Sequence, residues 1–432
     1  MNVILPLCYI IIFAFIIYKS RFFRSSGLSY KVLLGIFGVK LLSAFALHYL
    51  YTLYYTSRIE ADIFKYFDDS YIMFQSFTHK PSDFFRLFFG YDLQNESLDV
   101  YFKYMNFWVR KIDYGLFNDN RTIIRINVII MFFSWGNIFV HHIFASFISL
   151  FAFLLIFKVF DNLFPNRKTV LIVCIFLIPS SLFWASAMLK ECIVMLGLGI
   201  FLYAMYFLIQ RKYSIRLFIL FFIGILLLMT IKIYVLAALI PAVIAYYCSL
   251  RFEKIPTWKI YFGLLLFFIC IVICNQFLQG IPFLETISAK RNNFIVDSIY
   301  YSSARSYIDI GILKPTLWAF LIETPLAIYR SLSMPYFWNI TQAIEILPAL
   351  ENLALIILVL GMIFYYKKPV AIQAKFIWFC LFFSIGLLWF VGITTPVVGA
   401  IVRYKMPILP FLYTIFALLI DWQKIFQQFR KN

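Results

Sequence analysis

Long runs of apolar residues limit what this chain can fold into more than any other feature of its sequence. Several runs reach or exceed the roughly 20 residues that a helix needs to cross about 30 Å of hydrocarbon. They lack the period-two alternation of a membrane β-strand, and a helix satisfies its own backbone hydrogen bonds inside lipid. The apolar fraction of 63% and the charged fraction of 13% agree with lipid as the surrounding solvent. We therefore predict an all-α polytopic transmembrane helical bundle of about 10 to 11 spans.

The apolar segments indicate the order of the spans along the chain. They fall at residues 3–18, 32–56, 138–160, 169–188, 192–209, 217–231, 234–250, 260–279, 350–366, 376–393 and 406–421. Charged residues interrupt the stretches 169–209 and 217–250, and each stretch is too long for one span at about 1.5 Å per residue. Each stretch is therefore predicted to form a helical hairpin.

Two long segments, 57–137 and 280–349, separate the groups of spans. Both mix aromatic with charged residues, as amphipathic helices that lie on a membrane surface do. Within the second segment, charged residues and prolines break the apolar stretch 315–338, which we predict to be re-entrant or interfacial. We expect residues 1–432 to form a single integral membrane domain that contains both long loops.

The distribution of basic residues predicts the orientation of the bundle. The chain has 38 Lys and Arg against 20 Asp and Glu, a formal net charge of +18. Eighteen of these cations lie in six short segments on one side: Lys19, Arg21, Arg24, Lys31, Arg167, Lys168, Arg211, Lys212, Arg216, Arg251, Lys254, Lys259, Lys367, Lys368, Lys375, Lys424, Arg430 and Lys431. Only four, Lys190, Lys232, Arg403 and Lys405, lie in short loops on the other. Because cytoplasmic loops collect Lys and Arg, we expect a plasma or inner membrane protein with an outer N-terminus, a cytoplasmic C-terminus and outward-facing long loops. The same bias accounts for the basic charge without a nucleic-acid partner.

An acidic patch begins the first long outer loop. Asp62, Asp68 and Asp69 lie within a few residues of one another, and Asp62 and Asp69 would share one face of a helix because they are seven residues apart. A carboxylate at the outer mouth of a span would serve as a general base or bind a divalent cation. The alternative is that these acids only mark the solvated start of a loop.

Cations at membrane depth on the outer side form the second candidate group: Arg121, Arg125, Lys190, Lys232, Arg403 and Lys405. Charges near hydrocarbon are costly and are usually paired or functional. The two hairpin-tip lysines would either snorkel to the interface or bind phosphate. Arg403 and Lys405 are predicted to lie on an irregular buried turn between Pro396 and Pro407, where an arginine would hold phosphate through two parallel hydrogen bonds. Acids beside cations suggest an anionic, amphiphilic substrate such as a lipid phosphate or pyrophosphate.

Histidines and cysteines predict no metal site. His141 and His142 begin a span without further ligands at metal-binding spacing, and the seven cysteines fall within or at the edge of apolar runs. No glycine-rich nucleotide loop, G-x-S-x-G turn or H-E-x-x-H motif occurs in the chain.

Three segments resemble the GT-C superfamily of polytopic glycosyltransferases. The first is the acidic outer loop E-A-D-I-F-K-Y-F-D-D-S at 60–70. The second is I-P-S-S-L-F-W-A-S-A-M-L-K-E at 178–191, preceded by the span that begins V-H-H-I-F-A-S-F-I-S-L. The third is V-R-Y-K-M-P-I-L-P-F-L at 402–412, which is similar to the Arg-Tyr-x-x-Pro segment that opens a late span in that superfamily.

The resemblance implies an enzyme that transfers a sugar from a polyprenyl-phosphate donor to an envelope glycan, lipid or protein acceptor on the outer face. Asp62 matches the acid that deprotonates or orients the acceptor, with Asp68 and Asp69 as alternates. Arg403 matches the cation that holds the lipid phosphate, and Lys190 is a second match for that role. Membrane lipid is the other expected partner, and the resemblance names no protein partner.

Two other classes of protein fit the same features. An oligosaccharide repeat-unit polymerase of the O-antigen type would also have many spans and arginine-bearing outer loops, to which Arg121, Arg125, Arg305 and Arg330 would belong. A transporter or flippase of lipid-linked glycans is the third class. The sequence has no symmetric pair of Gly- or Pro-broken spans to support transport, and Lys40 is the main charge placed inside a span.

Overall fold

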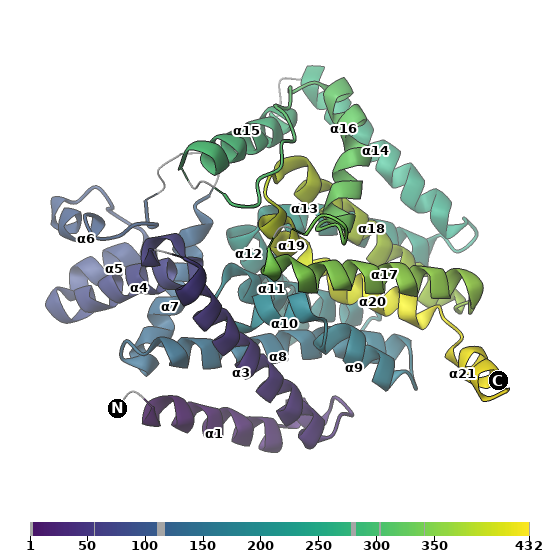
Figure 1. The fold of residues 1–432 in the computed structure, drawn as a ribbon, viewed down its shortest axis with the longest axis horizontal. Helices are drawn as coiled ribbons and strands as arrows, with labels where there is room; N and C mark the ends of the chain where they lie inside the picture. The colour runs from purple at the N-terminus through teal and green to yellow at the C-terminus, as the bar shows by residue number, and fades with distance from the viewer. Residues whose placement is uncertain are drawn as a thin grey trace. The chain divides into compact units, whose positions relative to one another are not determined.

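The computed structural model describes residues 3–55, 57–109, 117–277, 282–301, 304–340 and 342–431. In these ranges the chain is helical and contains no β-strand; two isolated bridges, Tyr307 with Val397 and Tyr366 with Ile420, are the extended pairings. The prediction of an all-α bundle is confirmed (Figure 1). The chain divides into two compact units, and each is described separately below.

Unit 1 comprises Met1–Lys158 and Leu182–Ile233. Its helices are α1 (Ile4–Lys19), α2 (Arg21–Arg24), α3 (Tyr30–Tyr54), η1 (Arg58–Glu60), α4 (Asp62–His79), α5 (Pro81–Phe89), η2 (Glu96–Leu98), α6 (Asp99–Phe102), α7 (Asp119–Ser134), most of α8 (Ile138–Leu163), the end of α10 (Pro179–Ser186), α11 (Lys190–Ile209) and α12 (Ile215–Ile231). The first long loop therefore contains a set of helices, of which α4 packs against α5 and α7 (Figure 1).

Small residues allow helices of unit 1 to approach closely. A Cβ on Gly224 of α12 would lie 2.8 Å from the backbone of Phe201 on α11, and a Cβ on Gly199 would lie 2.5 Å from the carbonyl oxygen of Ala152 on α8. The sequence thus builds a tight α8–α11–α12 core from glycines at the crossing points.

A hydrophobic cluster fixes where α4 begins. Ala61 and Ile63, on either side of Asp62, are buried together with Leu47 of α3 and Leu189, the residue before α11. The start of α4 is therefore held at the end of α3 and beside the first residue of α11.

Unit 2 comprises Val159–Ser181 and Tyr234–Asn432. Its helices are α9 (Lys168–Phe176), most of α13 (Ile233–Arg251), α14 (Thr257–Phe277), α15 (Phe283–Val296), the π-helical turn η3 (Asp297–Tyr301), α16 (Leu317–Ser333), η4 (Ala343–Glu345), α17 (Ile346–Phe364), α18 (Ala371–Thr394), α19 (Val398–Lys405), η5 (Met406–Ile408), α20 (Leu409–Leu418) and α21 (Trp422–Lys431). Helices α17 and α20 lie side by side, and α18 packs against α15, α16 and α20 (Figure 1).

Gly392 sets the distance between α16 and α18. The carbonyl group of Ala327 on α16 occupies the space that a Cβ on Gly392 would need. Any larger residue at this position would push the two helices apart, so the close contact depends on glycine.

The described helices confirm that the chain is a multi-pass membrane protein. Eight helical segments are long and apolar enough to cross a bilayer, or nine if the bent pair α9–α10 forms one span; α1 and α12 are shorter apolar helices. Helix α14 exposes large apolar side chains, among them Phe262 and Phe267, along its length. Such a surface suits lipid rather than water. Helix α16, with its internal Pro325, is not among the spanning candidates.

Two local features differ from the sequence-based expectation. The segment predicted as one span at 169–188 breaks after Phe176, because Pro179 starts a new helix and disfavours a helical conformation in the residue before it. Arg403 and Lys405 were predicted on an irregular turn but lie on helix α19. Pro407 does not interrupt this helix from within, because it occupies the first turn of η5, where its missing N–H costs nothing.

The orientation remains a prediction with a direct test. In a background lacking the seven native cysteines, a cysteine at position 290 should react with a membrane-impermeant maleimide added to intact cells. A cysteine at the exposed position of Val370 should react only after permeabilisation, because positively charged loops stay in the cytoplasm. The reverse pattern of labelling would show that the whole bundle is inverted.

Candidate functional site

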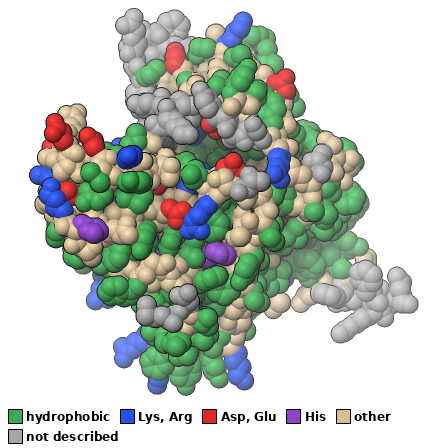
Figure 2. Space-filling model, turned by 60° about the vertical axis from the view of Figure 1, so that its left-hand side comes forward, with side chains coloured by type: hydrophobic (Ala, Val, Ile, Leu, Met, Phe, Trp, Pro, Cys, Tyr) green, Lys and Arg blue, Asp and Glu red, His purple; other side chains and the backbone are tan. Residues whose placement is uncertain are grey.

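The three predicted acids of α4 lie in different surroundings. Asp62 is half-buried, with one carboxylate oxygen 2.7 Å from the Lys65 ammonium. Asp68 forms a two-point contact with Arg58, whose Nε and Nη2 donate to its carboxylate over 2.7 and 2.8 Å. On the side of unit 1 that carries α4, α5 and α6, Figure 2 shows acidic and basic side chains interspersed among hydrophobic ones.

Asp69 is buried and holds a loop in place. Its two oxygens accept hydrogen bonds from the backbone N–H groups of Asn106, Phe107 and Trp108, at 2.9, 2.8 and 2.9 Å. Burial raises the pKa of Asp69 above its ordinary value of 3.8, and these three hydrogen bonds oppose the rise. A carboxylate so occupied by its own backbone is poorly placed to take a proton from a substrate.

Lys190 stands at the centre of the strongest charged group of unit 1. Its ammonium lies 2.8 Å from a carboxylate oxygen of Asp119 and donates to Asn120 over 2.6 Å. The same ammonium lies 5.3 Å from the ring centre of Tyr66, which follows Asp62 by one helical turn. The structure therefore brings Lys190 to the side of α4 that begins with Asp62.

The sequence did not mark Asp119, Asn120 and Tyr66 as candidate site residues. Their contacts with Lys190 depend on how α4, α7 and α11 pack. The first two lie at the start of α7, where side-chain oxygens commonly gather to complement the helix end.

Other predicted cations of unit 1 already have protein contacts. Lys232, between α12 and α13, lies 3.3 Å from Glu191, the residue after Lys190. Arg125 donates to the Phe88 carbonyl and stands 5.0 Å from the ring centre of Trp108, on which Arg121 also stacks at 5.1 Å.

Three histidines of unit 1 form a polar group in which His141 and His142 are buried and His48 is half-buried, whereas His79 is exposed at the end of α4. His48 Nδ1 and His142 Nε2 are 3.1 Å apart, and His141 contacts Asn127 and Ser134. Across the part of the chain that the structure describes, no group of three or more His, Cys, Asp or Glu side chains is arranged to hold a metal ion. The acids of α4, where a divalent cation would bind, each have a different partner.

All three hydrogen-bond donors of the Lys405 ammonium group, in unit 2, are used by the protein itself. Its buried ammonium donates to the carbonyl oxygens of Leu332 and Met334, at 3.1 and 2.8 Å, and to the side-chain oxygen of Asn352 at 2.9 Å. These acceptors use all three donors of an ammonium group. Lys405 therefore has no donor left for a phosphate in this structure. Arg403 is half-buried on the same helix.

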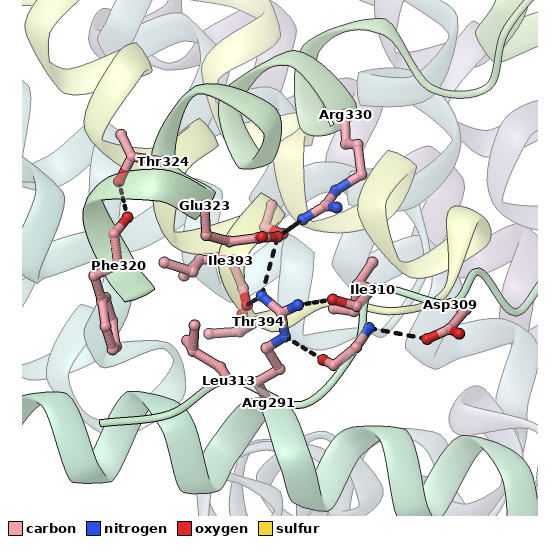
Figure 3. Close-up of polar contacts among 12 residues, drawn as sticks. Arg291, Asp309, Ile310, Leu313, Phe320, Glu323, Thr324, Arg330, Ile393 and Thr394 are labelled. Carbon is pink, nitrogen blue, oxygen red and sulfur yellow. Dashed lines mark hydrogen bonds and ion pairs between the residues drawn. The ribbon is translucent and has the colours of Figure 1, made fainter. Parts of the chain in front are cut away.

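A cluster that the sequence did not single out lies elsewhere in unit 2. Arg291 and Arg330 both point toward the carboxylate of Glu323 (Figure 3). Glu323 and Arg330 are seven residues apart on α16, so they lie on one face of that helix. That spacing could have indicated the pair, whereas the contribution of α15 could not be read from the sequence.

The role of Asp69 as a loop anchor predicts a stability effect. Asp69→Asn should lower the free energy of unfolding by about 1–3 kcal/mol, because an amide NH₂ replaces an acceptor and leaves a backbone N–H without its partner. Thermal unfolding of the purified protein in detergent measures the change. Asp99→Asn, on the exposed start of α6, is the control and should stay within about 0.5 kcal/mol. Equal stability of the two variants would contradict the anchor role.

The same residue has a predicted pH dependence. Because the pKa of Asp69 is raised by folding, the folded state binds its proton more tightly than the unfolded state does. The stability advantage of wild type over Asp69→Asn should therefore grow as the pH falls through the folded pKa toward 3.8, and should be smallest and constant above the folded pKa. Melting curves of both proteins between neutral and mildly acidic pH give this difference.

No protein-family model matches the chain, and no curated protein and no solved structure matches it either.

Proposed function

We propose that the protein is a membrane glycosyltransferase that moves a sugar from a polyprenyl-phosphate donor to an acceptor on the outer face of the membrane. The observation that carries the proposal is that Lys190 lies over the ring of Tyr66, one helical turn after Asp62 on α4. The residues that flank Asp62 share a hydrophobic cluster with Leu189, and the Lys190 ammonium lies over the ring of Tyr66. Lys190, the first residue of α11, thus lies on the side of α4 that begins with Asp62.

The chemistry follows from these two charges. The Asp62 carboxylate takes the proton of an acceptor hydroxyl while the hydroxyl oxygen bonds to the anomeric carbon of the sugar. The bond between that carbon and the phosphate oxygen breaks, and polyprenyl phosphate leaves with one more negative charge. Lys190 and Lys232 stabilise the departing phosphate. Asp119 and Glu191 hold these lysines in place. Of the three acids of α4, Asp62 is favoured because it lies one helical turn before Tyr66, over whose ring Lys190 lies. Asp68 accepts two bonds from Arg58, and Asp69 accepts three bonds from backbone N–H groups. Asp62 would exchange its contact with Lys65 for the acceptor hydroxyl.

A repeat-unit polymerase is the second candidate. Stacked arginines occur in the first outer loop, where Arg121 and Arg125 share the Trp108 ring, and paired arginines occur in the second, where Arg291 and Arg330 share Glu323. Such pairs suit a substrate with a lipid pyrophosphate on each of two glycan chains.

The experiment that tests the function is product analysis. The purified protein is reconstituted into proteoliposomes with a polyprenyl phosphate carrying a radiolabelled sugar and with membrane extract as the source of acceptor. A single new labelled product, together with release of polyprenyl phosphate, is expected for the transferase. A ladder of products from a lipid-pyrophosphate oligosaccharide would instead indicate the polymerase. Movement of intact donor across the bilayer without any product would exclude both enzymes and indicate a transporter.

A further inference from the structure

Two buried arginines of unit 2 share one carboxylate. Arg291 on α15 contacts Glu323 over 3.1 Å, and Arg330 on α16 contacts the same oxygen of Glu323. The arginine side chains are buried, whereas that of Glu323 is 17% exposed. Two guanidinium groups thus share one carboxylate in a largely dehydrated place, where a poorly paired charge is costly. The other acid nearby, Asp309, interacts electrostatically with Arg291.

The two arginines differ in how much of their hydrogen-bonding capacity the protein uses. Arg291 donates to the carbonyl oxygens of Gly311 at 2.9 Å, of Ile310, and of Ile393 at 3.4 Å (Figure 3). It is therefore fixed mainly by backbone. Arg330 has Glu323 and a long contact of 3.5 Å to the Gly392 carbonyl, and its buried Nε has no hydrogen-bond partner among the described residues. Arg330 is therefore the arginine of the pair that has an unused hydrogen-bond donor, its Nε.

The helix that carries Arg330 also offers a surface for an alkyl chain. Trp318, Ile322, Leu326 and Tyr329 lie three or four residues apart on α16, and all of them are exposed. This spacing places them along one stripe of the helix that ends beside Arg330. An anion attached to a long apolar chain can therefore contact the stripe with its chain and Arg330 with its head.

We infer that Arg330, with Arg291 beside it, binds the phosphate headgroup of a lipid. Without the lipid, Glu323 pairs with Arg330, and the phosphate replaces Glu323 as the partner of Arg330 when it binds. The phosphate would accept from Nε and Nη of Arg330, the edge that forms two parallel bonds with phosphate oxygens. Glu323 remains paired with Arg291. The exposed apolar stripe favours a lipid phosphate over a phosphate dissolved in water. This site lies in a different unit from Asp62, and its test does not require sugar transfer.

The test measures binding of farnesyl phosphate to the full-length protein in nanodiscs of neutral phosphatidylcholine. Arg330→Gln should weaken binding by about 10- to 100-fold, the range expected for a lost charged hydrogen bond. Arg330→Lys should also weaken it, because an ammonium group cannot reproduce the two-point contact. Glu323→Gln should tighten binding by about tenfold, because the internal competitor loses its charge. Lys314→Gln, which removes an exposed charge three residues before α16, is the control and should leave binding unchanged.

The opposite signs expected for Arg330 and Glu323 separate a binding site from a structural ion pair. If the cluster were only structural, both variants would lower the melting temperature and neither would tighten binding, and the inference would be wrong. Equal binding of farnesol would also overturn it. Inorganic phosphate or pyrophosphate binding as tightly as farnesyl phosphate would exclude a lipid as the source of the anion. Displacement of farnesyl phosphate by phosphatidylglycerol nanodiscs would assign the site to bulk membrane lipid. Asp62→Asn should leave this binding intact, so a failure of the transferase proposal is recognised separately.

Discussion

Asp62→Asn is expected to reduce sugar transfer by about 10²- to 10⁴-fold, the usual contribution of a positioned general base. Asparagine keeps the size of aspartate but cannot accept a proton. Affinity for the polyprenyl-phosphate donor should change little, because the donor is held by cations and by its apolar chain. Single-turnover assays with saturating labelled donor measure the rate of the chemical step. Equilibrium binding of the donor measures its affinity for the protein.

Asp68→Asn is the matched control on the same helix. It removes the same charge less than two turns away on α4, from a carboxylate that forms a two-point contact with Arg58. It should retain most of the transfer rate. If Asp68→Asn abolishes transfer and Asp62→Asn does not, the base is Asp68 and the assignment of Asp62 is refuted.

Lys405→Ala is expected to destabilise the protein by about 3–5 kcal/mol, the range for breaking a buried charged network. Three oxygen acceptors, from Leu332, Met334 and Asn352, would lose their donor inside the bundle. Glu351, which interacts electrostatically with Lys405, would lose a nearby positive charge as well. The loss of melting temperature in detergent, with intrinsic tryptophan fluorescence as the signal, reports the effect.

Lys405→Met separates packing from hydrogen bonding, because methionine keeps most of the apolar stem without the ammonium. It should be nearly as unstable as Lys405→Ala. The exposed Lys254→Ala serves as the control and should melt like the wild type. Should both Lys405 variants fold normally and instead lose binding of a polyprenyl phosphate, the phosphate-binding role that the sequence suggested would replace the structural one.

The spans could be predicted from the sequence because the length and apolarity of a segment determine whether it can cross lipid. Helices α8, α11 and α14 begin and end within a few residues of the segments predicted for them. The break before Pro179 and the helix around Arg403 were not predicted. Proline and glycine act through their exact position in a helical turn, and that position depends on packing.

The candidate site could be predicted only in part. Asp62 and Lys190 were recognisable because isolated charges at the ends of apolar segments are costly unless they are used. The partner of Lys190 could not be recognised, because Asp119 is 71 residues away along the chain. The same holds for the cluster of unit 2, in which Arg291 is 32 residues from Glu323. Pairs so distant in sequence are set by helix packing, for which a single sequence without a motif gives no signal.

The glycine contact between α18 and α16 has a mechanical consequence. Because the Ala327 carbonyl fills the space beside Gly392, α16 cannot turn or slide along α18 without a collision. Helix α18 is a spanning candidate of 24 residues, and such a helix adjusts its tilt when the bilayer becomes thinner or thicker. The short helix locked to it must follow that tilt. In a bilayer that α18 spans, the depth of Arg330 and Glu323 would therefore change with membrane thickness, which would make lipid chain length a physical control on this part of the protein.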